Sequence, residues 1–434
     1  MSAALRSFEA QWRARQADAL QPIREQAMQR FLKLGLPTLR DETWRYTDLR
    51  SLAAQSYQAA AGEVRGTLDP GASLSLVDAQ ASTPTLVMVN GAAPADADAV
   101  SINGFEISSI RALSKHDYNS LLRFFPPVSD ADQRRWTLLN TALFNDGLYL
   151  KITGQVTVPL IILHVSTGDS AQELAHPRII IDALPGASAT IIEHHVTHGE
   201  VAPLNNSNTH IALGKDAQLE HYRVYATGAG ATHLDALDIH QAQGSRCKQF
   251  TIALGGGLVR SSLEAHLNQS GASLESYSLL VGHEDRHVDC VNIVRHAAPH
   301  TRSRQTARAI ASDVSRVIFN SKVIVEAGAV HADSQQSCRG LLLSPNAEID
   351  TRPQLEIHAD EVKCAHGATT GRLDPDMLFY LLSRGLDRET AQSLLVYAFL
   401  ADVLTGMSVT SARAAIEGAL ISQLPDSQIL RKFR

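Results

Sequence analysis

The sequence predicts a mainly β protein whose strand-rich centre lies between helical regions at the two ends of the chain. Short runs of alternating apolar and polar residues, such as VPLIILHVS, SATIIEHHV and QLEHYRVYA, dominate residues 150–365. Few helical segments interrupt them, so a doubly wound sheet of βαβ units is disfavoured. Small corners (LPGAS, LGKDAQ, QSGAS, EAGA and SPNAE) separate the runs, mostly at steps of roughly 30 residues or twice that. A large sandwich and a β-solenoid remain, and the recurring corners favour the solenoid.

The first expected domain, residues 1–145, is helical and then mixed. Apolar residues recur at helical spacing from Leu5 to Leu32 and predict one long helix that ends at the GLP sequence of residues 35–37. TLVMVNG predicts a strand closed by an Asn-Gly turn, and RRWTLLNTALF predicts a helix leading into DGLYLKI. The second domain, residues 146–370, is the β core.

The third region, residues 371–434, is expected to be a helical segment. Asp374 and Pro375 have the residue types of a helix N-cap and first turn, and Asp387 is placed to cap the next helix. A last helix is predicted over SARAAIEGALISQL. The second of these helices has a mostly apolar face, which either the solenoid or a partner protein must cover. We expect this face at Leu394, Leu395, Ala398, Phe399, Asp402 and Val403.

The bulk composition narrows the class of protein. The chain has 434 residues and a formal net charge of −6, so nothing favours nucleic-acid or anionic-membrane binding. It has no apolar run of about 18 residues, and its charged N-terminus does not resemble a secretory signal. The four cysteines lack CxxC spacing, which fits a reducing cytoplasm. Three of them, Cys247, Cys290 and Cys338, are expected to be core thiols.

The stretch EVKCAHGATTGRLD, residues 361–374, carries the candidate chemistry. GATTGR is not a Walker loop, because it has too few residues between its glycines and no following lysine. Cys364 and His366 are two residues apart, so on a strand they would share one face. The pair could be a thiol nucleophile with its base, two ligands of a soft metal site completed elsewhere, or a buried thiol beside a hydrogen-bonded histidine.

Residues 345–386 closely resemble the C-terminal signature of the SufD family of iron–sulfur cluster assembly proteins. Their sequence is PNAEIDTRPQLEIHADEVKCAHGATTGRLDPDMLFYLLSRGL. GLPTLRDETWRYTDL, LVMVNG and LNTALFNDGLYLKI resemble the family in the expected order, so the similarity covers most of the chain. The related SufB proteins typically have glutamate where Cys364 stands. Alanine at position 365, where serine is common in the family, is a minor departure.

This resemblance implies a right-handed parallel β-helix between an N-terminal helical domain and a C-terminal helical segment. It implies a non-enzymatic, cytoplasmic scaffold that pairs with SufB and binds the SufC ATPase, with no nucleotide site of its own. Cys364 and His366 match the family's Cys-x-His, which implies a transient iron–sulfur cluster shared with SufB. The C-terminal helices would dock the ATPase. We expect six partner-binding residues there: Met377, Phe379, Tyr380, Leu394, Leu395 and Phe399.

Two alternatives from other classes remain open. β-Solenoids often carry polysaccharide-cleaving sites, but the acidic residues here are dispersed and the secretion signal common in such enzymes is missing. A purely structural homodimer without cluster chemistry is the second alternative, because an unpaired solenoid edge can pair with itself.

Overall fold

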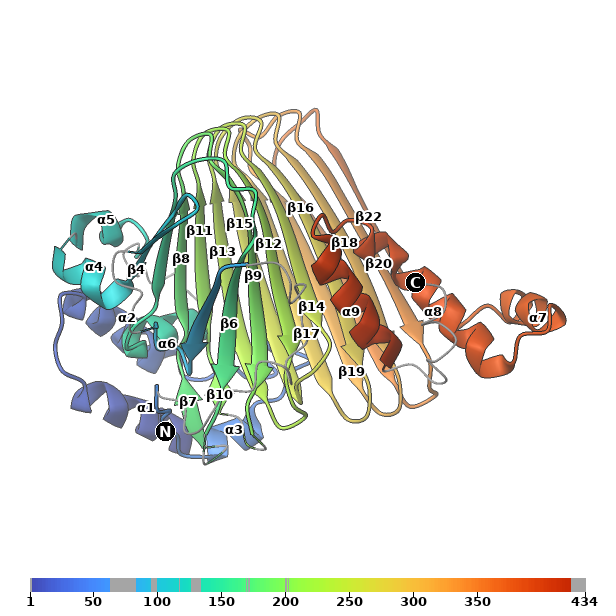
Figure 1. Cartoon of the computed structure of the whole chain (residues 1–434), viewed down its shortest axis with the longest axis horizontal. Coiled ribbons are helices and arrows are strands. Elements are labelled where there is room, and N and C mark those ends of the chain that lie inside the picture. Colours follow the sequence, from blue (N-terminus) through green and yellow to red (C-terminus); the bar gives the residue numbers. More distant parts are fainter. Residues whose placement is uncertain are drawn as a thin grey trace.

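The computed structural model is a parallel β-solenoid with helices at both ends of the chain (Figure 1). It describes residues 2–422 except 63–82, 95–99, 117, 126–133, 169, 171, 200 and 202. Two sheets face each other, and from β11 onward successive strands alternate between them. Each long strand pairs in parallel with the strand two places along the chain. The predicted mainly β fold with a solenoid core is therefore confirmed.

The first sheet, here called sheet B, has nine strands among the described residues. In spatial order they are β2 (Thr85–Val89), β6 (Leu160–Ser166), β9 (Ser188–Thr197), β12 (Gln218–Ala226), β14 (Arg246–Ala253), β16 (Ser273–Gly282), β18 (Arg302–Ala311), β20 (Asp333–Leu342) and β22 (Lys363–Gly371). The predicted TLVMVNG strand is β2, which forms the opposite edge of this sheet from β22.

The second sheet, sheet A, has thirteen described strands and faces sheet B. Its main path is β21 (Glu348–Ile357), β19 (Arg316–Val325), β17 (His287–His296), β15 (Leu258–Leu267), β13 (Thr232–Gln241), β11 (Asn208–Leu213), β8 (Arg178–Ala183), β5 (Leu148–Ile152), β4 (Phe105–Ser109) and β3 (Val100–Ile102). Three short strands lie beside this path: β1 (Gln58–Ala59), β7 (Glu173–Ala175) and β10 (Leu204–Asn205). Strands β3, β4 and β5 pair antiparallel, so a hairpin continues the sheet at its N-terminal end.

One row of corners between the two sheets has a residue with positive φ in successive coils. Gly186, Asp216 and Gly271 hold this conformation at φ 73°, 56° and 76°, at three of the predicted corners. The same row continues through His300 and His331, both at φ 58°. Backbone hydrogen bonds join neighbouring corners, for example from His300 N to Val330 O at 3.0 Å. The His300 corner carries no glycine signal and the sequence did not predict it, whereas His331 lies in the loop of the predicted EAGA corner, which contains Gly328.

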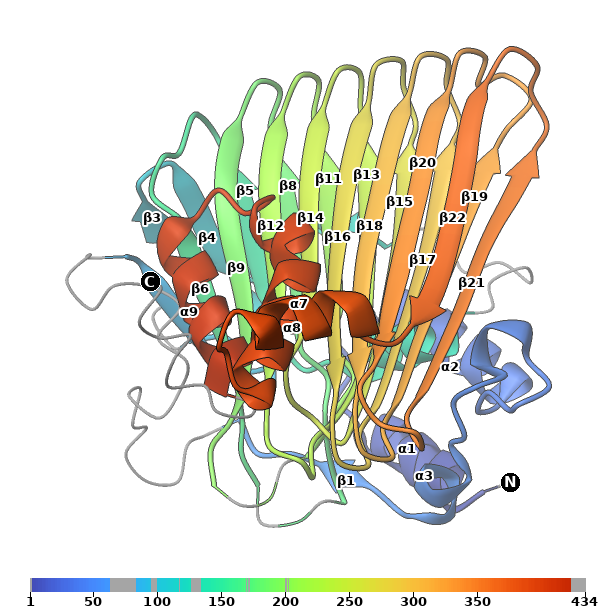
Figure 2. The ribbon, with the colours of Figure 1, turned by 90° about the vertical axis from the view of Figure 1, so that its right-hand side faces the viewer.

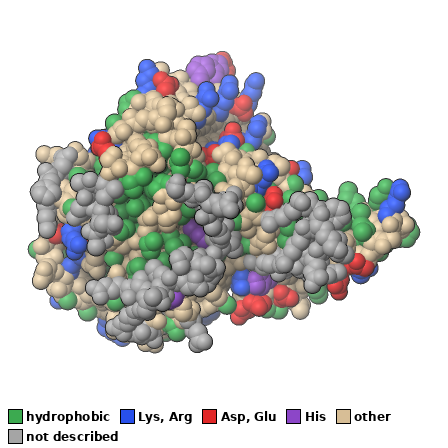
Figure 3. All heavy atoms as spheres, in the orientation of Figure 1, with side chains coloured by type: hydrophobic (Ala, Val, Ile, Leu, Met, Phe, Trp, Pro, Cys, Tyr) green, Lys and Arg blue, Asp and Glu red, His purple; other side chains and the backbone are tan. Residues whose placement is uncertain are grey.

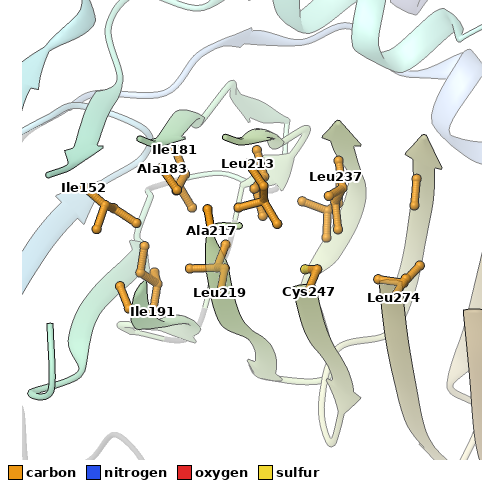
Figure 4. Close-up of a cluster of buried hydrophobic side chains, with 14 of the residues drawn as sticks. Ile152, Ile181, Ala183, Ile191, Leu213, Ala217, Leu219, Leu237, Cys247 and Leu274 are labelled. Carbon is orange, nitrogen blue, oxygen red and sulfur yellow. The ribbon is translucent and has the colours of Figure 1, made fainter. Parts of the chain in front are cut away.

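The apolar core fills the space between the two sheets (Figure 4). Ile181 and Leu213 project from sheet A toward Ile191 and Leu219 of sheet B, and all four are almost fully buried. Cys247 lies in the same cluster. Alternation along each strand makes every second residue point inward, so the apolar periodicity of the sequence becomes this core.

The N-terminal region contains separate helices rather than the single long helix that the periodicity predicts. They are α1 (Ala3–Ala14), α2 (Gln21–Leu34), η1 (Glu42–Trp44), α3 (Arg50–Ala54), α4 (Ile110–His116), α5 (Tyr118–Leu122) and α6 (Arg135–Leu143). The break between α1 and α2 is made by Asp18, whose carboxylate accepts from Leu20 N at 3.0 Å and pairs with Arg15 and Arg24. Such a local side-chain bond competes with continued helix.

The segment DETWRYTDL fastens the N-terminal region to the outer face of sheet A. Arg260, which is buried, pairs with Asp289 of the neighbouring strand and donates to Thr43 O at 2.7 Å. Its guanidinium carbon lies 3.7 Å from the centre of the Trp44 ring. Thr47 donates its hydroxyl to the same Asp289 carboxylate. The buried Arg260–Asp289 pair therefore binds a segment that lies more than two hundred positions earlier in the chain.

The C-terminal helices are α7 (Pro375–Ser383), α8 (Arg388–Leu404) and α9 (Thr410–Ser422). Helix α8 packs on the outer face of sheet B through Val396, Leu400 and Val403. The predicted apolar face is therefore wrong in part, because Leu394, Leu395 and Phe399 are only half-buried and Ala398 is exposed. No described helix combines the length and apolar character needed to cross a membrane.

We predict that Asp289→Ala lowers the free energy of unfolding by about 3–5 kcal/mol, because it leaves the buried Arg260 charge without its partner. Urea denaturation followed by circular dichroism measures this. Asp350→Ala is the matched control, since Asp350 pairs with the partly exposed Arg316 and should cost no more than about 1 kcal/mol. Equal, small losses of stability for the two substitutions would show that the buried Arg260–Asp289 pair does not hold the N-terminal segment on sheet A.

Candidate functional site

Cys364 and His366 lie on β22, the last strand of the solenoid. In the parallel register Cys364 stands beside Ser334 and His366 beside Gln336 of β20. Both β20 residues are buried in the solenoid interior, and neighbours in register share a face. Cys364 packs against the apolar core, which confirms that this face points inward. The two predicted site residues therefore share the inner face, as their spacing indicates.

The solenoid is open at this end. β22 and β21 are the edge strands of the two sheets, and each has a described neighbour on one side only. Nearly all of β22 is exposed, and β21 is half-buried along most of its length. Helices α8 and α9 lie over sheet B instead of closing the end (Figure 2). The interior face that carries Cys364 is thus accessible from outside.

A polar row in the interior leads up to the open end. Ser303 and Ser334 share a hydrogen bond of 2.8 Å just behind Cys364. Gln336 donates to Ser321 Oγ at 2.9 Å, while its buried Oε1 atom has no partner. Since Gln336 is the register neighbour of His366, this oxygen is available to orient the imidazole. The side chains behind the site are therefore fixed, whereas the site itself is exposed.

The Cys364 thiol is not activated as a nucleophile. Burial raises its pKa above the ordinary value, and the nearby Asp333 carboxylate raises it further, against a lowering by the Ser334 backbone hydrogen bond. An activated thiol would need a neighbouring positive charge that lowers the pKa. The electrostatics thus disfavour the nucleophile hypothesis and leave the ligand hypothesis open.

Cys364 and His366 supply two ligands at most. Among the described residues, they belong to no group of three or more converging histidine, cysteine or acidic side chains. A protein metal site usually needs four ligands. Among the described residues no third side chain completes a site here, so a metal or cluster bound by this pair would need further ligands.

The six predicted partner-binding residues separate into two sets. Met377, Phe379 and Tyr380 on α7 are exposed by 57%, 71% and 56%. Hydrophobic side chains are visible on the arm that α7 forms (Figure 3). The three residues on α8 are half-buried, and Phe399 packs against the cluster that holds α8 on sheet B. The α7 set is thus the more available for a partner.

The structure also brings together a group of interior side chains that the sequence analysis did not single out. Its members are His164, Glu193, His195, His233 and Asp235, all buried. A signal was present, because Glu193 and His195, and likewise His233 and Asp235, are metal-ligand types two residues apart on strands.

Comparison with known proteins shows similarity along nearly the whole chain. Residues 164–399 match the SufBD core domain of SUF-system FeS cluster assembly, and residues 5–162 match the SufBD protein N-terminal region. The chain is 30% identical over 407 residues to the iron–sulfur cluster assembly protein SufD of Escherichia coli, covering 93% of each protein. It is 28% identical over 400 residues to an iron–sulfur cluster assembly SufBD family protein of Synechocystis, covering 88% of this chain and 86% of the relative.

We predict that native alkylation with iodoacetamide modifies Cys364 alone. Cys247, Cys290 and Cys338 are buried, and burial raises the pKa of each to about 12. Because the pKa of Cys364 is also raised, its labelling rate should still increase from about pH 7 to about pH 9. Peptide mass spectrometry identifies the site, and Cys364→Ser is the control. A rate that is already constant at neutral pH would reveal an activated thiolate.

Proposed function

This chain belongs to the SufBD family of iron–sulfur cluster assembly proteins, and we propose that it is a SufD-type scaffold subunit in that family. In this role the chain performs no catalysis and has no nucleotide site. It pairs with SufB, binds the SufC ATPase and works in the cytoplasm. Its three parts would be the N-terminal domain at residues 1–145, the β core at 146–370 and the ATPase-docking segment at 371–434.

The open end of the solenoid carries the pairing proposal. Exposed edge strands have unpaired N–H and C=O groups, and a second sheet edge can satisfy them. The two edges differ, because β21 contains Pro353, which has no backbone N–H to donate. β22 contains no proline. We therefore assign the SufB contact to β22, the strand that bears Cys364 and His366.

The cluster is cargo rather than a resident group on this proposal. Cys364 and His366 offer a thiolate and an imidazole, which are ligands suited to iron and sulfide chemistry. SufB would supply the remaining ligands across the β22 edge. The site would then exist only in the complex, which agrees with the two-ligand limit found for this chain.

The ATPase would dock on α7. This helix begins at Pro375 and exposes three large apolar side chains. Only residues 372–374 separate it from the end of β22 at Gly371. Helix α8 is instead fixed to sheet B, and Gly385, at φ 89°, lies between α7 and α8. A shift of α7 on ATP binding by the partner would therefore reach β22 directly and alter the access to the cluster ligands.

We predict that Phe379→Asp, combined with Met377→Asp, weakens SufC binding by about tenfold or more, because buried aromatic anchors dominate interfaces. Co-purification from cells that express all three subunits measures it. SufB should still co-purify, since β22 is intact. Val314→Asp is the matched control, as Val314 is 59% exposed on a solenoid corner. If the α7 variant retained SufC fully, the docking assignment would be wrong.

We also predict that His366→Ala lowers cluster formation by the co-expressed complex by about tenfold or more. Iron and sulfide content of the purified complex is the measurement. His358→Ala, which removes an exposed histidine just beyond β21, is the control and should leave the yield unchanged. An unchanged yield with His366→Ala would remove the ligand role. A chain that forms only a homodimer beside SufB would contradict the scaffold proposal itself.

A further inference from the structure

The interior of the first coils contains a group of buried histidines and carboxylates between the two sheets. His164 and His195 project from sheet B, and His233 and Asp235 project from sheet A across the same space. Glu193 lies two residues before His195. This group lies several coils away from Cys364 and His366, and it plays no part in the proposed function.

Glu193 is the member of the group whose hydrogen bonds are satisfied, although Nδ1 of His164 is buried without a partner. Glu193 accepts hydrogen bonds from His164 at 3.1 Å, from His221 at 2.7 Å and from the Thr209 hydroxyl at 2.9 Å. Glu193 is thus a carboxylate with its lone pairs occupied.

His195, His233 and Asp235 have buried polar atoms without hydrogen-bond partners. His195 Nε2, both ring nitrogens of His233 and Asp235 Oδ2 are buried without a hydrogen-bond partner. The Arg223 guanidinium donates to Ser261 Oγ at 2.8 Å, and the Tyr225 hydroxyl, which interacts with Asp235, is the side-chain donor that competes for this oxygen. Buried polar atoms are rarely left in this state, and several at one place indicate a missing ligand.

The unpaired atoms converge and their side chains are held in place. One donor atom from each of His195, His233 and Asp235 lies within 4.8 Å of the others. The second oxygen of Asp235 accepts from the Ser207 hydroxyl at 2.9 Å. The His195 ring is stacked between His164, at 4.2 Å between centroids, and Tyr225, at 4.9 Å. Supporting contacts of this kind orient metal ligands in proteins.

We propose that His195, His233 and Asp235 bind a divalent transition-metal ion inside the solenoid. Two imidazoles and one carboxylate form a donor set that suits zinc or iron(II) and leaves a coordination position open. Around a metal the donors would lie about 3–4 Å apart, since each bond is about 2.1 Å, so small side-chain rotations complete the site.

Such an ion would connect the two sheets, because His195 belongs to β9 whereas His233 and Asp235 belong to β13. Trapped water is the competing occupant, as a water could also bridge the unpaired atoms. The two differ in measurable ways: a metal ion adds mass, has a stoichiometry and can be removed by a chelator.

The test uses the full-length chain carrying Cys364→Ser and His366→Ala, so that the edge site cannot contribute. Chelator-treated protein is titrated with cobalt(II) and zinc(II), and elemental analysis counts the metal kept after gel filtration. We expect about one equivalent per chain, a cobalt absorption band in the visible range and a higher melting temperature with metal. Failure of this test would leave the proposed cluster function standing, since that function uses only the edge strand.

His195→Gln and His233→Gln should each lower the retained metal at least about tenfold, with folding checked by circular dichroism. His194→Gln is the matched control, because the adjacent His194 is also buried but points to the opposite face of β9. Equal metal retention in all three variants would show surface binding only and overturn the proposal. No stoichiometric metal in the parent protein would overturn it even if a variant failed to fold.

Discussion

Stacking of one coil on the next, through in-register parallel strands, is the constraint on which the rest of this structure depends. Each strand inside the stack has both of its edges hydrogen-bonded, so only the two ends of the solenoid have unpaired backbone groups. The N-terminal end is continued by the β3–β4 hairpin beside the helical region. Among the described residues, no strand continues either sheet beyond β21 and β22 at the C-terminal end. An incomplete end is therefore a consequence of the architecture, and it determines where another sheet can join.

The same stacking places different polar side chains at the two ends of the solenoid interior. Near the open end, small polar side chains such as Ser334 and Gln336 stand behind the exposed pair on β22. In the first coils the interior is closed by both sheets, and its histidines lose contact with water. The exposed open end suits a ligand pair that a partner protein completes. The closed first coils suit an ion that is bound once and then retained. Both derive from the alternation of inward and outward residues on strands.

The fold could be predicted from sequence where a backbone requirement selects a recognisable residue type, such as glycine at a corner with positive φ. Corners with Gly186, Gly271 or Gly328 were recognisable, but His300 adopts the same left-handed backbone in a corner with no glycine to indicate it. The predicted long N-terminal helix is interrupted at Asp18, whose local bonds to Leu20 N and two arginines compete with a continued helix. The shared face of Cys364 and His366 followed from spacing alone. The interior group could not be assembled from sequence, since His195 and His233 meet only across two sheets.

The short connection of residues 372–374 makes the direction of force on α7 important. β22 is bonded to a single neighbour, so it can leave the sheet without breaking its bonds to a second strand. A pull along the strand axis would load all the bonds to β20 together and meet high resistance. A pull across that axis would load them one at a time, starting beside Gly371, and would reach His366 before Cys364. The imidazole would therefore be released before the thiol, which gives ligand release an order set by geometry.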